Sequence, residues 1–221
     1  MMAETPAGPS QASVYDRYYK CGGDHWEHAP GKAVLLHALR LCLQKRQHIR
    51  LLDIGCGTGS FLSSAHDALG GNCEVLYSVD ISQVAIDMAR SQHSGFTFDC
   101  RDATLLNQPD GYFDAVICYG SWEHFSKPER AIEEAGRVLA PGGWVFAMVP
   151  ALGIHRNDRT DEGWYEDTEV LGCKCRQLQW NLRRTTWATM FQRAGIELIE
   201  DSLAHRCGAL KPGVFFFGIR I

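Results

Sequence analysis

Short apolar runs alternate with amphipathic stretches along the first two thirds of the chain, and this alternation predicts its secondary structure. Nearly continuous apolar runs are typical of strands covered on both faces, whereas apolar positions that recur every three or four residues indicate helices. The runs predict strands at 50–54, 74–79, 96–100, 113–119 and 144–149. Helices are expected at 34–43, 60–69, 82–92 and 126–139.

Polar and glycine residues mark the ends of these helices. Ser82 is a suitable N-cap for the helix that runs to Gln92. Ser126 and Glu129 have the spacing of a capping box, in which each side chain accepts a hydrogen bond from an amide at the helix start. The sequence Pro141-Gly142-Gly143 is expected to end that helix.

The last part of the chain departs from this order. A helix is expected at 185–194, followed by strands at 196–200 and 214–221. The loop that leads to the last strand is short, and a short loop suits an antiparallel return. Strands alternating with helices imply right-handed crossovers. The predicted fold is therefore α/β, with a Rossmann-like, seven-stranded, mostly parallel sheet, helices on both faces and an antiparallel last strand.

The length of 221 residues suits one domain. We expect a flexible tail at 1–12 and a single domain at 13–221, in which 13–48 form an N-terminal helical cap. Residues 151–184 are charged and aromatic, with no strong periodicity in their first half. Long connections of this kind are usually lids or binding loops, so an acceptor-binding insertion is expected there.

Composition and charge narrow the function. The net charge of −4 offers no broad basic surface for a phosphate backbone, so nucleic acid is not an expected partner. No apolar run is long enough to span a bilayer, and residues 1–12 lack the pattern of a secretory signal. We expect a soluble, cytoplasmic protein with no membrane partner; the sequence does not indicate its oligomeric state.

Nine cysteines, an odd number without a repeating framework, favour a reducing compartment, and disulfides are not expected. Cys173 and Cys175 supply two thiolates where a structural zinc site needs four ligands. We therefore expect no metal.

The most informative segment is the glycine turn that follows the first strand. Gly55, Gly57 and Gly59 form G-x-G-x-G, whereas a dinucleotide fingerprint, G-x-G-x-x-G, requires glycine at position 60, which is Ser60. Asp53 precedes the turn and suits a ligand with an ammonium group better than one with a pyrophosphate. Ligands of open parallel sheets bind beyond the carboxyl ends of the strands, where these residues lie.

These motifs resemble those of the class I S-adenosylmethionine-dependent methyltransferases, in particular the small-molecule branch of ubiquinone-biosynthesis-like enzymes (methyltransferase types 11 and 25). The resemblance covers about residues 49–150. It rests on Leu51-Leu52-Asp53-Ile54-Gly55-Cys56-Gly57-Thr58-Gly59, Tyr77-Ser78-Val79-Asp80-Ile81-Ser82, Phe113-Asp114-Ala115-Val116-Ile117-Cys118-Tyr119 and Arg137-Val138-Leu139-Ala140-Pro141-Gly142-Gly143.

The resemblance implies S-adenosyl-L-methionine as cofactor and S-adenosyl-L-homocysteine as product. Asp80 matches the acid that binds the ribose hydroxyls, and Asp102 the position that meets the adenine amine; the alternative for Asp102 is a helix N-cap. The expected cofactor-binding set is Asp53, Gly55, Cys56, Gly57, Gly59, Asp80, Ile81, Asp102, Ala103 and Tyr119.

Methyl transfer depends mainly on alignment and on exclusion of water, so it requires no fixed catalytic residue. A base helps when the acceptor is a hydroxyl or an ammonium group. Glu123 and His124 lie where the acceptor should approach and are the catalytic candidates; in the family such a pair also serves structure or cofactor packing.

Two segments are expected to border the acceptor, which we take to be a small molecule. Tyr15, Tyr18, Tyr19 and Trp26 belong to an N-terminal segment that either folds over the cofactor or simply fastens the first helix to the domain. The family builds its acceptor pocket after the fifth strand. The substrate-binding candidates are Trp26, His155, Arg156, Arg159, Trp164 and Tyr165.

Three other functions share part of this pattern. A nucleotide-dependent oxidoreductase also needs a glycine turn, but Asp53 and the glycine spacing argue against it. A methyltransferase-like binding subunit without activity would keep the same motifs. A nucleic-acid methyltransferase would carry an Asn/Asp-Pro-Pro-aromatic signature where this chain has Cys118-Tyr119-Gly120-Ser121.

Overall fold

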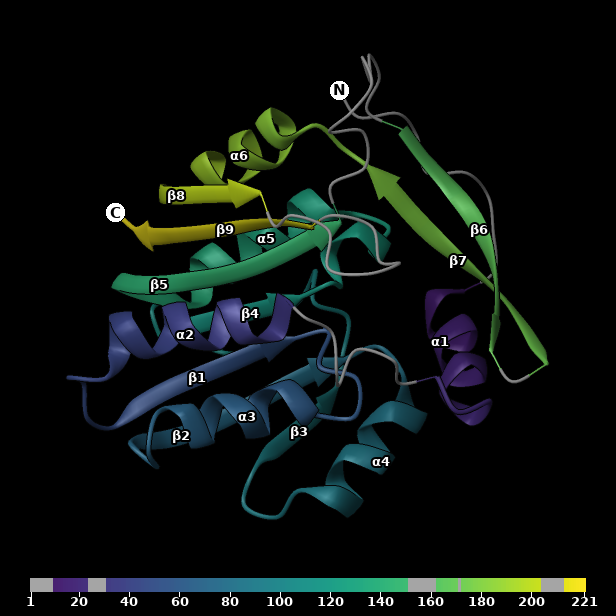
Figure 1. Ribbon diagram of the computed structural model, residues 1–221, viewed down its shortest axis with the longest axis horizontal. Helices are drawn as coiled ribbons and strands as arrows, with labels where there is room; N and C mark the ends of the chain where they lie inside the picture. Colours follow the sequence, from purple (N-terminus) through teal and green to yellow (C-terminus); the bar gives the residue numbers. More distant parts are fainter. Residues whose placement is uncertain (1–9, 24–30, 151–161, 171, 204–212) are drawn as a thin grey trace.

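The computed structural model describes residues 10–23, 31–150, 162–170, 172–203 and 213–221. Its centre is a seven-stranded sheet in the order β3-β2-β1-β4-β5-β9-β8 (Figure 1). The strands β1 to β5 are parallel, and β9 is antiparallel to both β5 and β8. The strands are β1 Ile49–Ile54, β2 Cys73–Asp80, β3 Thr97–Cys100, β4 Phe113–Tyr119, β5 Leu139–Pro150, β8 Ile196–Leu203 and β9 Gly213–Arg220. The predicted fold class is confirmed.

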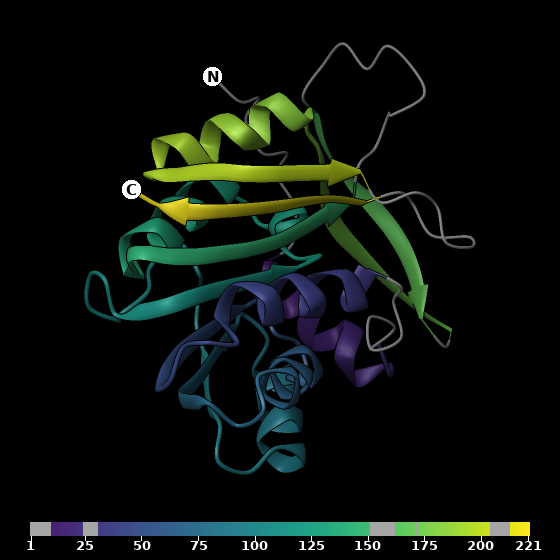
Figure 2. The same ribbon diagram turned by 60° about the vertical axis from the view of Figure 1, so that its left-hand side comes forward.

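Helices cover both faces of this sheet. One face carries α2, α3 and α4, and the other carries α5 and α6 (Figures 1 and 2). The helices are α1 Gln11–Lys20, α2 Gly31–Leu43, α3 Ser60–Ala68, α4 Gln83–Gln92, α5 Pro128–Val138 and α6 Arg184–Arg193, with a 3₁₀ turn, η1, at Trp122–His124. None of the helices in the described ranges has the length and apolar character needed to cross a bilayer.

The two faces are built from alternate residues of the same strands. In β4, Ala115 and Ile117 pack with α2 and α3, whereas Val116 and Cys118 pack with α5 and α6. All four are fully buried, as expected where successive side chains point to opposite sides of a covered sheet. This double burial explains why the strand signal in the sequence is a continuous apolar run.

Two strands lie outside the main sheet. β6, Glu162–Val170, and β7, Cys173–Asn181, form an antiparallel hairpin within the segment where the sequence predicts only an insertion. The hairpin lies beyond the ends of β1, β4 and β5 toward which their arrows point, and α1 lies beside it (Figures 1 and 2). The main sheet therefore directs the carboxyl ends of its parallel strands toward α1 and this hairpin.

Some expected boundaries differ from the structure. Ser82 is the N-cap of α4, as predicted, and its side chain accepts a hydrogen bond from the Ala85 amide. The capping box is wrong: α5 begins at Pro128, and the N-cap position belongs to Lys127. Proline suits the first helical position because its missing amide hydrogen would have no partner there.

The cysteine expectation also needs correction. Among the side chains that the structure describes, six cysteines are free thiols: Cys42, Cys56, Cys73, Cys100, Cys118 and Cys175. Cys21, directly after α1, is disulfide-bonded, although the odd number of cysteines favoured reduced thiols. The parity of a cysteine count does not reveal which residues the fold brings together.

Arg137 fastens α5 to the loop that precedes β4. Its guanidinium donates to the carbonyl oxygens of Leu106 and Gln108 and pairs with Asp110 and Glu134. Glu134 is 3% exposed and also accepts a hydrogen bond from the Leu106 amide. The bonds from Arg137 lower the pKa of Glu134, so the buried acid keeps its charge.

Replacing Arg137 by Leu should lower the free energy of unfolding by about 3 kcal/mol, because it leaves the buried Glu134 carboxylate without its main partner. Urea denaturation measures this. Arg130 is a matched control, since it binds Glu133 and Glu134 from an exposed position, and Arg130→Leu should cost less than about 1 kcal/mol. Equal losses in the two variants would contradict this account.

Candidate active site

The glycine turn joins β1 to α3 at the switch point of the sheet, between β1 and β4. Gly55 and Gly57 have φ angles of 71° and 55°, in the left-handed region that other residues rarely adopt. A Cβ atom on Gly57 would lie 2.5 Å from the Tyr19 hydroxyl, and one on Gly55 would lie 2.5 Å from the Ser121 side chain. The turn thus needs glycine for both its conformation and its close packing.

Asp80 ends β2 and holds the two neighbouring turns together. Its Oδ2 accepts a hydrogen bond of 2.9 Å from the Gly57 amide, and its Oδ1 accepts one of 2.9 Å from the Ser82 amide. Burial raises the pKa of Asp80, and the backbone hydrogen bonds oppose that shift. A carboxylate oxygen accepts more than one hydrogen bond, so Asp80 keeps capacity for hydroxyl groups.

Asp53, in β1, is 1% exposed, and its Oδ2 has no hydrogen-bond partner among the described residues. Burial raises the pKa of Asp53 to about 7, the charge of Asp80 adds to this, and Lys32 opposes it. A buried carboxyl group with an unused oxygen costs free energy unless a ligand satisfies it. An ammonium group fits this requirement.

Glu123 and His124 lie in η1, just beyond β4. Glu123 is fully buried, and its Oε1 lies 3.7 Å from Nε2 of His124. The opposite ring nitrogen of His124, Nδ1, is 2.8 Å from the Leu178 carbonyl oxygen in β7. The two side chains therefore lie side by side, and the hairpin holds the histidine ring; their catalytic role stays a prediction.

Helix α1 approaches the same place. Asp16 accepts hydrogen bonds from the Ser82 hydroxyl, at 2.7 Å, and from the Val84 amide, at 3.2 Å, which fastens α1 to the start of α4. The Tyr15 ring lies edge-on to His124, 6.1 Å between centroids. Its hydroxyl is shielded from solvent, with no hydrogen-bond partner among the described residues. Burial, then the charges of Glu123 and Asp80, raise the pKa of Tyr15.

The sequence places Tyr15 in a segment near the cofactor without giving it a contact, and it does not indicate Asp16 at all. The spacing of Tyr15, Tyr18 and Tyr19 shows that the tyrosines share part of a helix, but it does not show what that helix covers. Asp16 gives no signal in the sequence, because its partners are 66 and 68 positions away.

The other cofactor candidates lie around the same strand ends, and their role stays a prediction. Tyr119 ends β4 with its ring packed on Phe61, and burial raises its pKa to about 12. Asp102 is exposed and accepts a hydrogen bond from the Thr104 amide in a turn, so the helix N-cap alternative is wrong. Cys56 and Ala103 are buried, and Ile81 is half-buried.

The structure places the backbone of two predicted acceptor residues and does not describe the other four. Trp26, His155, Arg156 and Arg159 lie outside the described residues. Trp164 and Tyr165 belong to β6, and of these two residues the backbone alone is described. Within the described ranges, no group of three or more His, Cys, Asp or Glu side chains is arranged to hold a metal ion.

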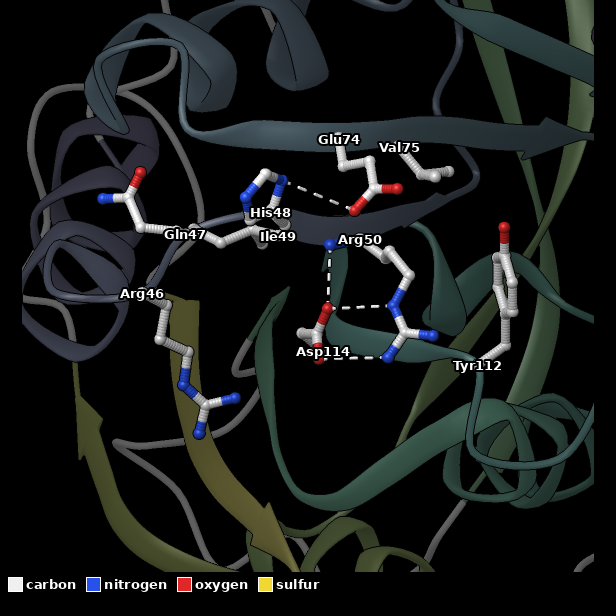
Figure 3. A pocket seen from close by; sticks show the side chains of 9 residues that line it. All are labelled: Arg46, Gln47, His48, Ile49, Arg50, Glu74, Val75, Tyr112 and Asp114. Carbon is white, nitrogen blue, oxygen red and sulfur yellow. Dashed lines mark hydrogen bonds and ion pairs between the residues drawn. The ribbon is translucent and has the colours of Figure 1, made fainter.

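A separate hollow of about 560 Å³ lies at the amino ends of β1 and β2 (Figure 3). Its polar side chains largely face one another: Arg50 pairs with Asp114 at 3.1 Å, and His48 lies 3.8 Å from Glu74. Parallel sheets place their chemistry at the opposite edge. We therefore interpret the Arg50–Asp114 pair as a structural link between β1 and the start of β4.

Comparison with known protein families shows to which family the chain belongs. A family model described as "Methyltransferase domain" matches residues 25–201. The chain belongs to this family. Its sequence motifs and its fold are those of the class I S-adenosylmethionine-dependent methyltransferases.

Curated relatives of this methyltransferase-family chain include ubiquinone biosynthesis O-methyltransferases. That of Coxiella burnetii (strain RSA 493 / Nine Mile phase I) is 31% identical over 132 residues, which are 55% of each chain. That of Paraburkholderia xenovorans (strain LB400) is 35% identical over 101 residues, 43% of this chain and 42% of the relative. The chain thus matches about half the length of these curated relatives.

Solved structures share the fold at low identity. The 1,6-didemethyltoxoflavin-N1-methyltransferase of Burkholderia thailandensis, solved with 1,6-didemethyltoxoflavin and S-adenosylhomocysteine, has a TM-score of 0.72 at 14% identity, covering 99% of this chain and 94% of that one. The [4+2]-cyclase SpnF has a TM-score of 0.65 at 21% identity, covering 91% and 77%.

The raised pKa of Asp53 predicts a pH dependence of stability for the ligand-free protein. The folded state keeps a proton on Asp53 up to a pH of about 7, whereas the unfolded state releases it near pH 4, so stability falls as pH rises between them. From pH 5 to pH 8, wild type should lose about 2–3 kcal/mol relative to Asp53→Asn. Urea denaturation at several pH values tests this, and parallel curves for the two proteins would contradict it.

Proposed function

We propose that the protein transfers the methyl group of S-adenosylmethionine to a small-molecule acceptor and releases S-adenosylhomocysteine. The observation that carries the proposal is the arrangement of Asp53, Asp80 and the glycine turn at the switch point. Two buried carboxyl groups on either side of a tight turn suit a ligand with hydroxyl groups at one end and an ammonium group at the other. S-adenosylmethionine has both.

In this proposal Asp80 accepts the ribose hydroxyls, and Asp53 satisfies the ammonium group through its unused oxygen. The turn at 55–59 lets the ligand approach the backbone closely. Asp102 and Ala103 border the adenine, and Cys56, Ile81 and Tyr119 line the remaining wall. When bound, S-adenosylmethionine supplies a methyl group activated by a sulfonium.

The chain's own contribution is alignment, exclusion of water and handling of a proton. Tyr15 and Asp16 bring α1 against the strand ends, and β7 packs on η1 from the other side, so the reacting groups are enclosed. Glu123 and His124 lie where a proton leaving the acceptor can be taken up. Removing a positioned base of this kind typically costs a factor of about 10²–10⁴.

A small-molecule acceptor is supported by the relatives, whose names refer to O-methylation in ubiquinone biosynthesis, and by a structural neighbour solved with 1,6-didemethyltoxoflavin. The net charge of −4 argues against nucleic acid. The residues proposed to border the acceptor remain Trp26, His155, Arg156, Arg159, Trp164 and Tyr165. We also propose a cytoplasmic location.

One observation favours a second candidate. The structural neighbour SpnF is named a [4+2]-cyclase, so this fold also occurs in a protein named for a different reaction. A methyltransferase-like protein that binds the cofactor without transferring its methyl group would keep Asp53, Asp80 and the glycine turn. Binding alone therefore does not distinguish the two candidates, but transfer does.

The test is a transfer assay with methyl-labelled S-adenosylmethionine and a panel containing a catechol, a phenol, a primary amine, a thiol and a cell extract of small molecules. We expect label in a small-molecule product. Glu123→Gln and His124→Gln should each lower kcat by about 10²–10⁴ while the affinity for S-adenosylhomocysteine changes less than about twofold. Tight binding with no label transferred to any acceptor would favour the silent binding protein instead.

A further inference from the structure

Two hydrogen bonds join β7 to the segment that carries the acid-histidine pair. The Leu178 carbonyl oxygen lies 2.8 Å from His124 Nδ1, and the Trp180 indole Nε1 donates to the Phe125 carbonyl oxygen at 2.7 Å. Leu178 and Trp180 are two positions apart on one strand, so they face the same side of the hairpin. The hairpin therefore holds η1 through the histidine ring and through the backbone immediately after it.

The bond to Leu178 fixes where the proton of His124 resides. A carbonyl oxygen only accepts hydrogen bonds, so Nδ1 must carry the hydrogen. In the neutral ring, Nε2 then holds the lone pair, on the side of Glu123 Oε1. Free histidine in water prefers the other tautomer, with the hydrogen on Nε2, which makes this a state that the protein imposes.

The Trp180 side chain is held in place by the core and by the neighbouring strand β6. Its side chain is 1% exposed and packs in the core with Leu178 and Leu182. The residue opposite it in β6 is Gly163, where a Cβ atom would lie 2.6 Å from the indole ring. The small residue on β6 thus leaves the space in which the indole ring lies.

We propose that β7 positions His124 for proton transfer: the Leu178 carbonyl selects the Nδ1–H tautomer, Trp180 holds the backbone beside it, and Nε2 is the atom that takes up the proton. This inference rests on the proposed function. It makes Trp180 a positioning residue that acts through Phe125 and His124, and it makes the hairpin part of the proton-handling machinery.

The inference also narrows the acceptor to a hydroxyl or amine that carries a proton on the attacking atom. The acceptor's oxygen or nitrogen bonds to the methyl carbon, the carbon–sulfur electron pair stays on sulfur as S-adenosylhomocysteine forms, and the acceptor's proton passes to Nε2. The resulting imidazolium has two N–H groups. One donates to the Leu178 carbonyl oxygen, and the other faces the Glu123 carboxylate.

The direct test is nitrogen NMR of the ligand-free protein with ¹⁵N-labelled histidine, with the His124 signals assigned by their loss in His124→Gln. The pH is raised until the ring is neutral. We expect Nδ1 to keep the hydrogen and Nε2 to show the shift of a bare nitrogen. A hydrogen on Nε2 with a bare Nδ1 would overturn the proposal whatever the acceptor is.

A pair of tryptophan variants tests the positioning role. Trp180→Phe removes the indole N–H, and the ratio of the Nδ1–H to the Nε2–H tautomer should fall about three- to tenfold. Trp187→Phe is the matched control, because Trp187 is 2% exposed in the core and has no described bond to η1; its ratio should match wild type. Equal tautomer ratios in all three proteins would overturn the role of Trp180.

A third variant covers the case in which Trp180→Phe does not fold. Gly163→Ala forces the indole ring to shift while keeping its N–H, and it should change the ratio in the same direction by a smaller factor. S-adenosylhomocysteine titration checks that each variant keeps its cofactor site. If the wild-type protein does not bind S-adenosylhomocysteine, that result counts against the proposed function. The tautomer ratio alone decides the role of the hairpin.

Discussion

The carboxylate of Asp80 joins three parts of the chain that are far apart in sequence. It accepts the amide hydrogens of Gly57 and Ser82, and Ser82 in turn donates its hydroxyl hydrogen to Asp16 in α1. A buried negative charge is costly unless hydrogen bonds surround it, and backbone amides at two turns supply them. The glycine turn, the start of α4 and the N-terminal helix are therefore held in one arrangement, and the rest of the site is built against it.

The site collects buried acids around these turns. The Asp53 carboxyl group, whose pKa burial raises to about 7, and the fully buried Glu123 lie at the same edge of the sheet as Asp80, and Lys32 opposes the pKa shift of Asp53 only in part. An S-adenosylmethionine molecule carries positive charge on its sulfonium and ammonium groups, so its binding would relieve the repulsion between these acids. The same electrostatics would weaken binding of a cofactor rich in phosphate.

The sequence predicts the parallel part of the fold well, because strands such as β4 are buried on both faces and therefore appear in the sequence as continuous apolar runs. The sites at their ends follow from topology, which places Asp53 and Asp80 at one edge of the sheet. The β6–β7 hairpin escaped prediction because its strands combine charged residues with aromatics and have no buried continuous run. Leu178 contributes a backbone oxygen to His124, and side-chain patterns carry no information on such a bond.

The central claim is that the carboxyl groups and glycine turn at the switch point form an S-adenosylmethionine site. Calorimetric titration of the purified protein with S-adenosylmethionine and, separately, with NADH tests it most directly, with Asp80→Ala as the comparison. We expect micromolar binding of S-adenosylmethionine, at least about tenfold weaker in the variant, and no comparable binding of NADH. Preference for NADH, or equal binding of S-adenosylmethionine by wild type and variant, would contradict it.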